Sequence, residues 1–231
     1  MEISHGANCA NTDVKSYLLK LKEAGLNSLP GTAAEILDDN VREVICPDKI
    51  NTNEWLNVIK AAHSIGLPTT STMMFGHVEN YHDIAKHMHE LKSLQLESNG
   101  ITEFVPLPYV ASEAPMYLRG LSRSGPSFRE SVLVHSISRI YFNESIKNIQ
   151  GSWVKMGYTG LSYLLDSGIN DVGGILMNET ITRSAGATHG QELDLIYIKN
   201  IVESKNMKLI ERNTKYDLLK EPTKANFDKL K

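Results

Sequence analysis

The chain has 231 residues, with 24 basic and 27 acidic side chains and a formal net charge of −3. This length can bury a sizeable core in one large domain or two small ones, and the charge balance gives no basic surface for nucleic acid or an anionic membrane. There is no run of about 18 apolar residues and no signal-peptide pattern after Met1. We therefore expect a soluble, cytoplasmic enzyme without a nucleic-acid or membrane partner.

Cysteine and histidine usage limits the metal chemistry. The two cysteines, Cys9 and Cys46, lie too far apart for a CxxC pair, a four-cysteine zinc site or a disulfide framework. One disulfide bridge or two free thiols are both open, and a reducing cytosol favours free thiols. His77 and Glu79 with His82 match no standard ligand set across a strand-to-helix turn, so no metal ligand is predicted. The three histidines at 82, 87 and 89 are expected on a solvated helix flank.

The predicted elements alternate between helix and strand along the chain. Strands are expected to begin near Leu26, Thr69, Ile101, Ile149 and Asn170, with a further strand at 207–212. Helices are expected after Thr12 or Asp13, over 33–44, after Thr52 or Asn53, from 81 to beyond 91, after Ser127, over 158–166, near 179–184 and over 191–203. Residues 108–126 are predicted to form a long loop, which in a compact domain is more often functional than idle.

Five strands that are each followed by a helix indicate an α/β fold with a parallel sheet and outer helices. No GxGxxG or GxxxxGK[ST] motif follows a strand, so neither a dinucleotide fingerprint nor a P-loop is present. A (β/α) TIM-type barrel needs eight such units in about 250 residues. The sequence therefore predicts a partial barrel of about five βα units in residues 1–206, with a terminal strand and a frayed tail in residues 207–231.

The active site of a parallel barrel forms at the carboxyl ends of its strands. The candidates there are Gly31, Thr32, Glu35, Phe75, Gly76, His77, Glu79, Pro106, Pro108, Tyr109, Gln150, Ser152, Trp153, Lys155, Gly173, Gly174, Met177 and Asn178, and the N-terminal stub adds Glu2, Ser4, His5 and Gly6. Glu35 is expected in the first turn of its helix, where it either complements the helix dipole or holds a ribose hydroxyl or an ammonium group. Trp153 is favoured as a core residue over a stacking platform.

Six stretches together resemble one known family: MEISHGA, LNSLPGTAAEIL, PDKINTNEWLNVIKAAHSIGLPTTSTMMFGHVE, EFVPLPY, IQGSWVKMG and INDVGGILMNETITRSAGATHG. They resemble the radical S-adenosylmethionine (SAM) enzymes that serve as subunit 2 of FO synthase. The resemblance extends in collinear order over residues 1 to about 190. The aminofutalosine and cyclic futalosine enzymes of menaquinone biosynthesis share much of the pattern.

The resemblance implies a reaction and its cofactors. A [4Fe-4S] cluster cleaves SAM to a radical that abstracts a hydrogen from L-tyrosine, and the 4-hydroxybenzyl fragment joins 5-amino-6-(D-ribitylamino)uracil on the way to coenzyme F-420. Glu35 is then implied near the ribose or methionine of SAM, Ser71, Gly76 and Glu79 along its adenine side, and Pro106 at the adenine pocket. The residues implied to face the substrate are His5, Gln150, Ser152 and Asn178.

One departure from the family is large. The family binds its cluster through a CxxxCxxC motif, and this sequence contains none. We therefore expect the chain to represent the C-terminal part of such an enzyme, without about three βα units, and to be inactive alone. Two alternatives are a futalosine-type sibling and a non-catalytic half-barrel that binds SAM or a partner, such as the other FO synthase subunit.

Overall fold

A computed structural model describes residues 2–31, 34–174, 180–187 and 194–218. Its centre is a pair of parallel strands, β1 (Thr69–Phe75) and β2 (Ile101–Pro108), with Met73 opposite Pro106. Parallel bridges extend this pair on both sides: Leu29 pairs with Thr69, Phe104 with Ile149, and Gln150 with Asp171. The five predicted strand positions are thus confirmed as neighbours in chain order, which is the arrangement of a partial barrel.

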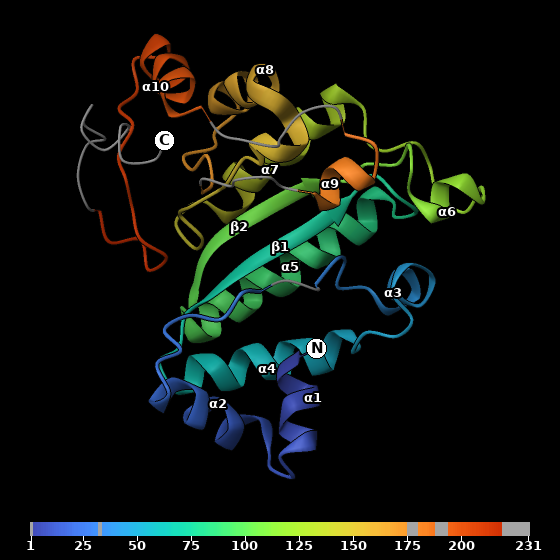
Figure 1. Cartoon of the computed structure of the whole chain (residues 1–231), viewed down its shortest axis with the longest axis vertical. Coiled ribbons are helices and arrows are strands. Elements are labelled where there is room, and N and C mark those ends of the chain that lie inside the picture. Colours follow the sequence, from blue (N-terminus) through green and yellow to red (C-terminus); the bar gives the residue numbers. More distant parts are fainter. Residues whose placement is uncertain (1, 32–33, 175–179, 188–193, 219–231) are drawn as a thin grey trace.

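Helices lie along this sheet and near the carboxyl ends of its strands (Figure 1). In chain order they are α1 (Glu2–Cys9), α2 (Val14–Glu23), α3 (Asp39–Ile45), α4 (Thr52–Ser64), α5 (Tyr81–Ser98), α6 (Pro115–Leu118), α7 (Phe128–Phe142), α8 (Trp153–Asp166), α9 (Ile181–Ser184) and α10 (Leu195–Ser204). Among the described residues, no helix is long and apolar enough to cross a membrane.

Side-chain caps explain where several helices begin. Asp13 caps α2, as predicted, and Ser127 caps α7 by accepting a hydrogen bond from the backbone N–H of Glu130. The predicted caps of α4, Thr52 or Asn53, are wrong by one and two positions, because Asn51 forms a reciprocal capping box with Glu54.

Four predicted boundaries are corrected. The helix expected over 33–44 is only α3, because Asp38 caps it and Glu35 has a left-handed backbone with φ of +46°. The N-terminal stub forms α1, and the loop over 108–126 contains α6. In place of the strand expected at 207–212, Arg212 forms a single antiparallel bridge with Leu218.

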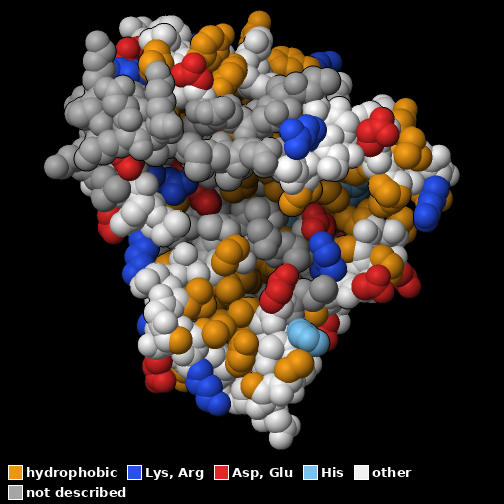
Figure 2. Space-filling view, in the orientation of Figure 1, with side chains coloured by type: hydrophobic (Ala, Val, Ile, Leu, Met, Phe, Trp, Pro, Cys, Tyr) orange, Lys and Arg blue, Asp and Glu red, His pale blue; other side chains and the backbone are white. Residues whose placement is uncertain are grey.

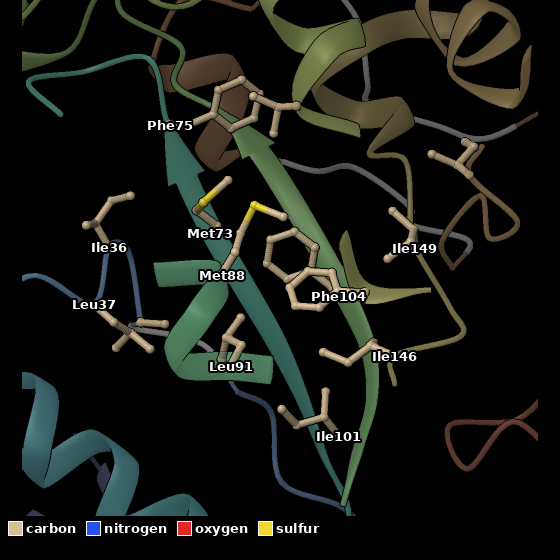
Figure 3. Close-up of a cluster of buried hydrophobic side chains, with 14 of the residues drawn as sticks. Ile36, Leu37, Met73, Phe75, Met88, Leu91, Ile101, Phe104, Ile146 and Ile149 are labelled. Atoms are coloured by element: carbon tan, nitrogen blue, oxygen red, sulfur yellow. The ribbon is translucent and has the colours of Figure 1, made fainter. Parts of the chain in front are cut away.

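The core lies between the sheet and its helices. Along β1, Thr69, Ser71, Met73 and Phe75 are buried, whereas the residues between them are half-buried on the opposite face. Met73 and Phe75 join Met88 and Leu91 of α5 in this core, and the ring of Phe104 on β2 packs 4.9 Å from that of Phe142 (Figure 3). Trp153 is 3% exposed, so its predicted core placement is confirmed.

Candidate active site

A cavity of about 360 Å³ lies at the carboxyl ends of β1 and β2. It is lined by Glu35, Met74, Leu107, Pro108, Tyr109, Val110, Glu113, Ala114, Pro115, Lys155, Ser184 and Ala185. The walls are mostly apolar, and a few charged side chains stand among them, which is typical of ligand sites. Figure 2 shows this face hollowed below α9, with hydrophobic, acidic and basic side chains around the hollow.

Glu35 reaches the cavity from the irregular segment before α3 and not from a helix. Its carbonyl oxygen accepts a hydrogen bond of 2.8 Å from the backbone N–H of Met74, which ties it to the end of β1. Its Oε1 lies 2.7 Å from Nζ of Lys49, and both side chains are partly exposed. The expectation that Glu35 complements a helix dipole is therefore wrong, whereas a role toward a hydroxyl or ammonium group is compatible with its position in the cavity wall.

The turn after β1 is held by Glu79. One carboxylate oxygen accepts a 2.6 Å hydrogen bond from the N–H of Gly76, and the other accepts a 2.8 Å bond from that of His77. The guanidinium of Arg123 lies 2.9 Å from the same carboxylate. A β-carbon on Gly76 would come within 2.2 Å of Pro126, so glycine lets this loop pack closely. Both predicted residues thus shape the loop beside the cavity and do not line it.

His77 contributes a buried imidazole to this turn, with Nδ1 3.0 Å from Oε2 of Glu79. Its Nδ1 accepts a hydrogen bond from the N–H of Val78, so its Nε2 carries the hydrogen that it donates to the carbonyl of Met74, 3.0 Å away. Burial lowers the pKa of His77, against the opposing charge of Glu79. The ring is therefore a fixed structural element of the strand end.

Two further predicted SAM-site residues lie within the sheet. The buried hydroxyl of Ser71 donates a 2.8 Å hydrogen bond to the carbonyl of Glu103, and Ser71 shares a face with Met73. Pro106 is buried opposite Met73. The strand end presents Leu107, Pro108 and Tyr109 to the cavity in place of these residues.

The predicted substrate residues are dispersed. Gln150 donates a 3.0 Å hydrogen bond to Glu103, and Ser152 is the N-cap residue of α8. His5 is exposed on α1, where its Nε2 lies 3.5 Å from the sulfur of Cys9. Asn178 lies outside the described residues. None of the three described residues, His5, Gln150 and Ser152, lines the cavity.

Sequence reasoning missed the cavity rim that α9 provides. The N–H of Glu113 donates a 3.0 Å hydrogen bond to the carbonyl of Ala185, and the hydroxyl of Ser112 donates to the same oxygen. A β-carbon on Gly186 would come within 1.8 Å of Ser112, so this glycine permits the close approach. The only sequence signal was the long predicted loop, which ends up supplying much of the lining.

Lys155 enters the cavity because α8 is broken. Gly157 has φ of +64° and ψ of 178°, so the first turn of α8 is set apart from the rest of the helix. This turn carries Lys155 to the lining, while Trp153 is anchored by an Nε1–H bond of 3.1 Å to the carbonyl of Gly174. Among the described residues, the cavity lining thus combines two acidic groups, Glu35 and Glu113, with one basic group, Lys155.

The described residues do not fit an iron–sulfur cluster. Both cysteines are free, Cys9 exposed and Cys46 buried, and burial raises the pKa of the Cys46 thiol. No group of three or more His, Cys, Asp or Glu residues is placed to hold a metal ion in the part of the chain that the structure describes.

The prediction of a solvated helix flank is wrong for His87. Its side chain is fully buried, and its Nδ1 accepts a hydrogen bond from the N–H of Leu37.

Family models match nearly the whole chain. The radical SAM superfamily model matches residues 2–91, and the model described as CofH/MqnC C-terminal region matches residues 98–225. Among solved structures, the crystal structure of methylornithine synthase has a TM-score of 0.65 at 17% identity, covering 95% of this chain and 59% of that chain. At this identity the likeness shows the fold alone.

Curated relatives are much closer in sequence. A 5-amino-6-(D-ribitylamino)uracil–L-tyrosine 4-hydroxyphenyl transferase of Methanocaldococcus jannaschii is 48% identical over 219 residues, which is 95% of this chain and 61% of that protein. An FO synthase of Nocardia farcinica is 45% identical over 216 residues, which is 94% of this chain and 25% of that protein. The chain therefore spans less than two thirds of each of these relatives. It belongs to the CofH/MqnC family of radical SAM enzymes.

Proposed function

We propose that this chain contributes to a radical SAM transferase that joins the 4-hydroxybenzyl group of L-tyrosine to 5-amino-6-(D-ribitylamino)uracil, as in FO synthase. The observation that carries the proposal is the 48% identity over 95% of this chain to a relative of that name. The cavity supports it, because it lies at the carboxyl ends of parallel strands, where barrel enzymes bind their substrates.

The cavity residues fit SAM, which carries an α-amino acid group, a ribose and an adenine ring. We propose that the Glu35 carboxylate, oriented by its contact with Lys49, holds the ammonium group or a ribose hydroxyl, and that Met74 and Leu107 provide apolar contact. When bound, SAM would supply the radical that the transfer requires. Gly76 and Glu79 are proposed to act on the adenine side by fixing the loop, and Ser71 and Pro106 by fixing the strands.

The [4Fe-4S] cluster, unlike SAM, has no binding residues among those that the structure describes. The described residues of this chain do not supply three thiolates, so no step is assigned to them at the cluster. The residues that we propose to face the substrates are His5, Gln150, Ser152 and Asn178. We also propose that this chain binds the other FO synthase subunit, and this proposal rests on the name FO synthase of a relative.

A chimera tests this function. The matching 219 residues of the M. jannaschii relative would be replaced by this chain, so that the remaining part of the relative completes the protein. Under reducing, oxygen-free conditions with SAM, we expect the chimera to consume L-tyrosine and the aminouracil together. The unmodified relative is the positive control. A chimera that cleaves SAM but leaves the aminouracil unchanged, or that consumes a futalosine-type substrate instead, would overturn the proposal.

Two variants of the chimera test the SAM contact. Glu35→Gln keeps the size of the side chain and removes its charge, so we expect weaker SAM binding. Glu113→Gln removes the other acidic charge of the cavity and is the matched control. Equal SAM affinity in both variants would contradict the role of Glu35 and leave the transferase proposal itself unaffected.

A further inference from the structure

The C-terminal segment, defined as residues 207–218, crosses the sheet face that lies opposite the α5 core. Nε of Arg212 lies 2.7 Å from Oδ2 of Asp171, and Nη2 lies 3.1 Å from Oε2 of Glu103. At the far end of the segment, Lys215 Nζ lies 3.4 Å from Oδ1 of Asn27, just before the first strand. The segment therefore contacts the last, the third and the first strand of the half-barrel.

Tyr216 is held in this segment against its backbone preference. Its φ is +66°, in the left-handed region that a bulky residue rarely adopts. The Arg212 guanidinium carbon lies 4.0 Å from the centroid of its ring, and its hydroxyl contacts Oδ2 of Asp171 at 2.5 Å and also Oε2 of Glu103. Such an outlier persists only where its surroundings determine it, so the position of this hydroxyl is the feature that the segment maintains.

The hydroxyl of Tyr216 is shared between the two carboxyl groups. Arg212 donates from Nε to Oδ2 of Asp171 and from Nη2 to Oε2 of Glu103, the same two oxygens that the hydroxyl contacts. Asp171 also accepts a 2.7 Å hydrogen bond from the N–H of Gly173. Burial raises the pKa of Glu103, against the hydrogen bonds from Tyr216 and Gln150. The four side chains therefore form one connected hydrogen-bond network.

This arrangement fixes the side chain of Gln150. Its Nε2 donates to Oε2 of Glu103 over 3.0 Å, so the amide oxygen Oε1 must point the other way. A β-carbon on Gly173 would lie 3.2 Å from that oxygen. Glycine at this strand end therefore leaves the acceptor of Gln150 room to meet a ligand.

We propose that Glu103, Asp171, Arg212 and Tyr216 form a hydrogen-bonded clamp that positions Gln150, so that its amide oxygen accepts an N–H group of the substrate. Arg212 and Tyr216 are thus positioning residues supplied by the C-terminal segment, and the aminouracil, which is rich in N–H donors, is the ligand class that fits. The identity of that substrate rests on the proposed function, whereas the clamp itself does not.

The chain itself tests the clamp. The side-chain amide signal of Gln150 in a ¹H–¹⁵N spectrum would be identified by its loss in Gln150→Leu. We expect Tyr216→Phe to shift this signal and speed its exchange with solvent, because removing the hydroxyl leaves the two carboxyl groups without their shared donor. Glu211→Gln, which removes an exposed charge beside Arg212, is the control and should leave it unchanged. An identical Gln150 signal in Tyr216→Phe would overturn the clamp.

The chimera tests the consequence for the substrate. For a lost, oriented hydrogen bond we expect Tyr216→Phe to raise the KM for the aminouracil about tenfold, with kcat and the KM for L-tyrosine within about twofold. Glu103→Gln removes the carboxylate that accepts hydrogen bonds from Gln150 and Arg212, so it should raise the same KM in the same direction. A KM for the aminouracil that both Tyr216→Phe and Glu103→Gln leave unchanged would refute the positioning role. If the chimera does not use the aminouracil, the proposed function fails and the amide signal still decides on the clamp.

Discussion

The buried carboxylate of Glu79 and the guanidinium of Arg123 lie 2.9 Å apart although 44 positions separate them in the chain. The same guanidinium makes two hydrogen bonds to Glu130 at the start of α7, at 2.6 and 2.8 Å. Arg123 therefore joins the turn after β1 to α7, beside the cavity. Bidentate pairs of this kind fix geometry as well as charge.

Removing this guanidinium should destabilise the protein. Arg123→Met leaves the buried Glu79 carboxylate without a cation, and since the arginine side chain is 40% exposed we expect a loss of about 1 to 3 kcal/mol of unfolding free energy. Urea unfolding would measure it. Arg129→Met, at an exposed position of the same region, is the control and should change the free energy by less than about 0.5 kcal/mol. Equal losses of unfolding free energy in the two variants would show that the contact between Glu79 and Arg123 does not stabilise the protein.

Two glycine positions allow the destabilisation from a steric clash to be measured apart from the destabilisation from a left-handed backbone. Gly76 and Gly120 both have positive φ, +97° and +71°, but only Gly76 has a neighbour, Pro126, in the way of a β-carbon. Gly120→Ala should cost about 1 kcal/mol through the backbone alone, and Gly76→Ala clearly more. Thermal unfolding of both variants would be compared. A Gly76→Ala protein as stable as Gly120→Ala would contradict the tight packing of the loop on Pro126.

Buried histidines should make stability depend on pH. Burial lowers the pKa of His63 and His135 to about 4 and that of His87 to about 3. In the unfolded chain a histidine titrates at about 6.5, so below that pH the unfolded state binds more protons than the folded state. The unfolding free energy should therefore be highest above about pH 6.5 and fall as the pH decreases from there toward about 4.

Substitution of one histidine checks this sign. His135→Leu removes a titrating group whose Nε2 has no hydrogen-bond partner among the described residues, so the variant's stability should fall less between pH 7 and pH 5 than that of the parent chain. His82→Ala changes an exposed ring and should leave the pH dependence as it is. Urea midpoints across this range give the slopes. A slope in His135→Leu equal to that of the parent would rule out a neutral, buried His135.

The aromatic contact in the core should be costly to lose. Phe104 is fully buried and packs against Phe142, so Phe104→Ala should lower the unfolding free energy by about 3 to 5 kcal/mol through lost burial and a new cavity. Leu96→Ala, at a side chain that is 73% exposed, should change it by less than about 0.5 kcal/mol. Chemical unfolding compares the two. A loss below about 1 kcal/mol in Phe104→Ala would mean that the core between β2 and α7 is misplaced.

The sequence allowed the strand order to be predicted, because five short apolar runs each precede a helix and such units add to a parallel sheet in order. It did not allow the start of α3 to be placed. The run from Ala33 to Val44 has helical composition, but Asp38 caps a later start and the carbonyl of Glu35 pairs with β1. At this position, hydrogen bonds to distant parts of the chain outweigh the helix propensity of the local sequence.

The candidate site was predicted in part. Glu35, Tyr109 and Lys155 were recognised as strand-end residues and line the cavity, since strand ends can be located from the pattern alone. The rim formed by α9 and the clamp around Tyr216 could not be predicted. Both depend on pairings between distant segments, such as Ser112 with Ala185 and Glu103 with Tyr216, and no local spacing indicates such pairings.

The contact of Lys215 with Asn27 joins residues that are 188 positions apart. Contacts of such long range form late, because the entropy of closing the loop must be overcome before the contact stabilises anything. During synthesis the first strands emerge long before Tyr216 does. The sheet face opposite the α5 core therefore lacks its contacts with the C-terminal segment until that segment has been made. Protection of that segment against proteolysis therefore reports a half-barrel that has finished assembling.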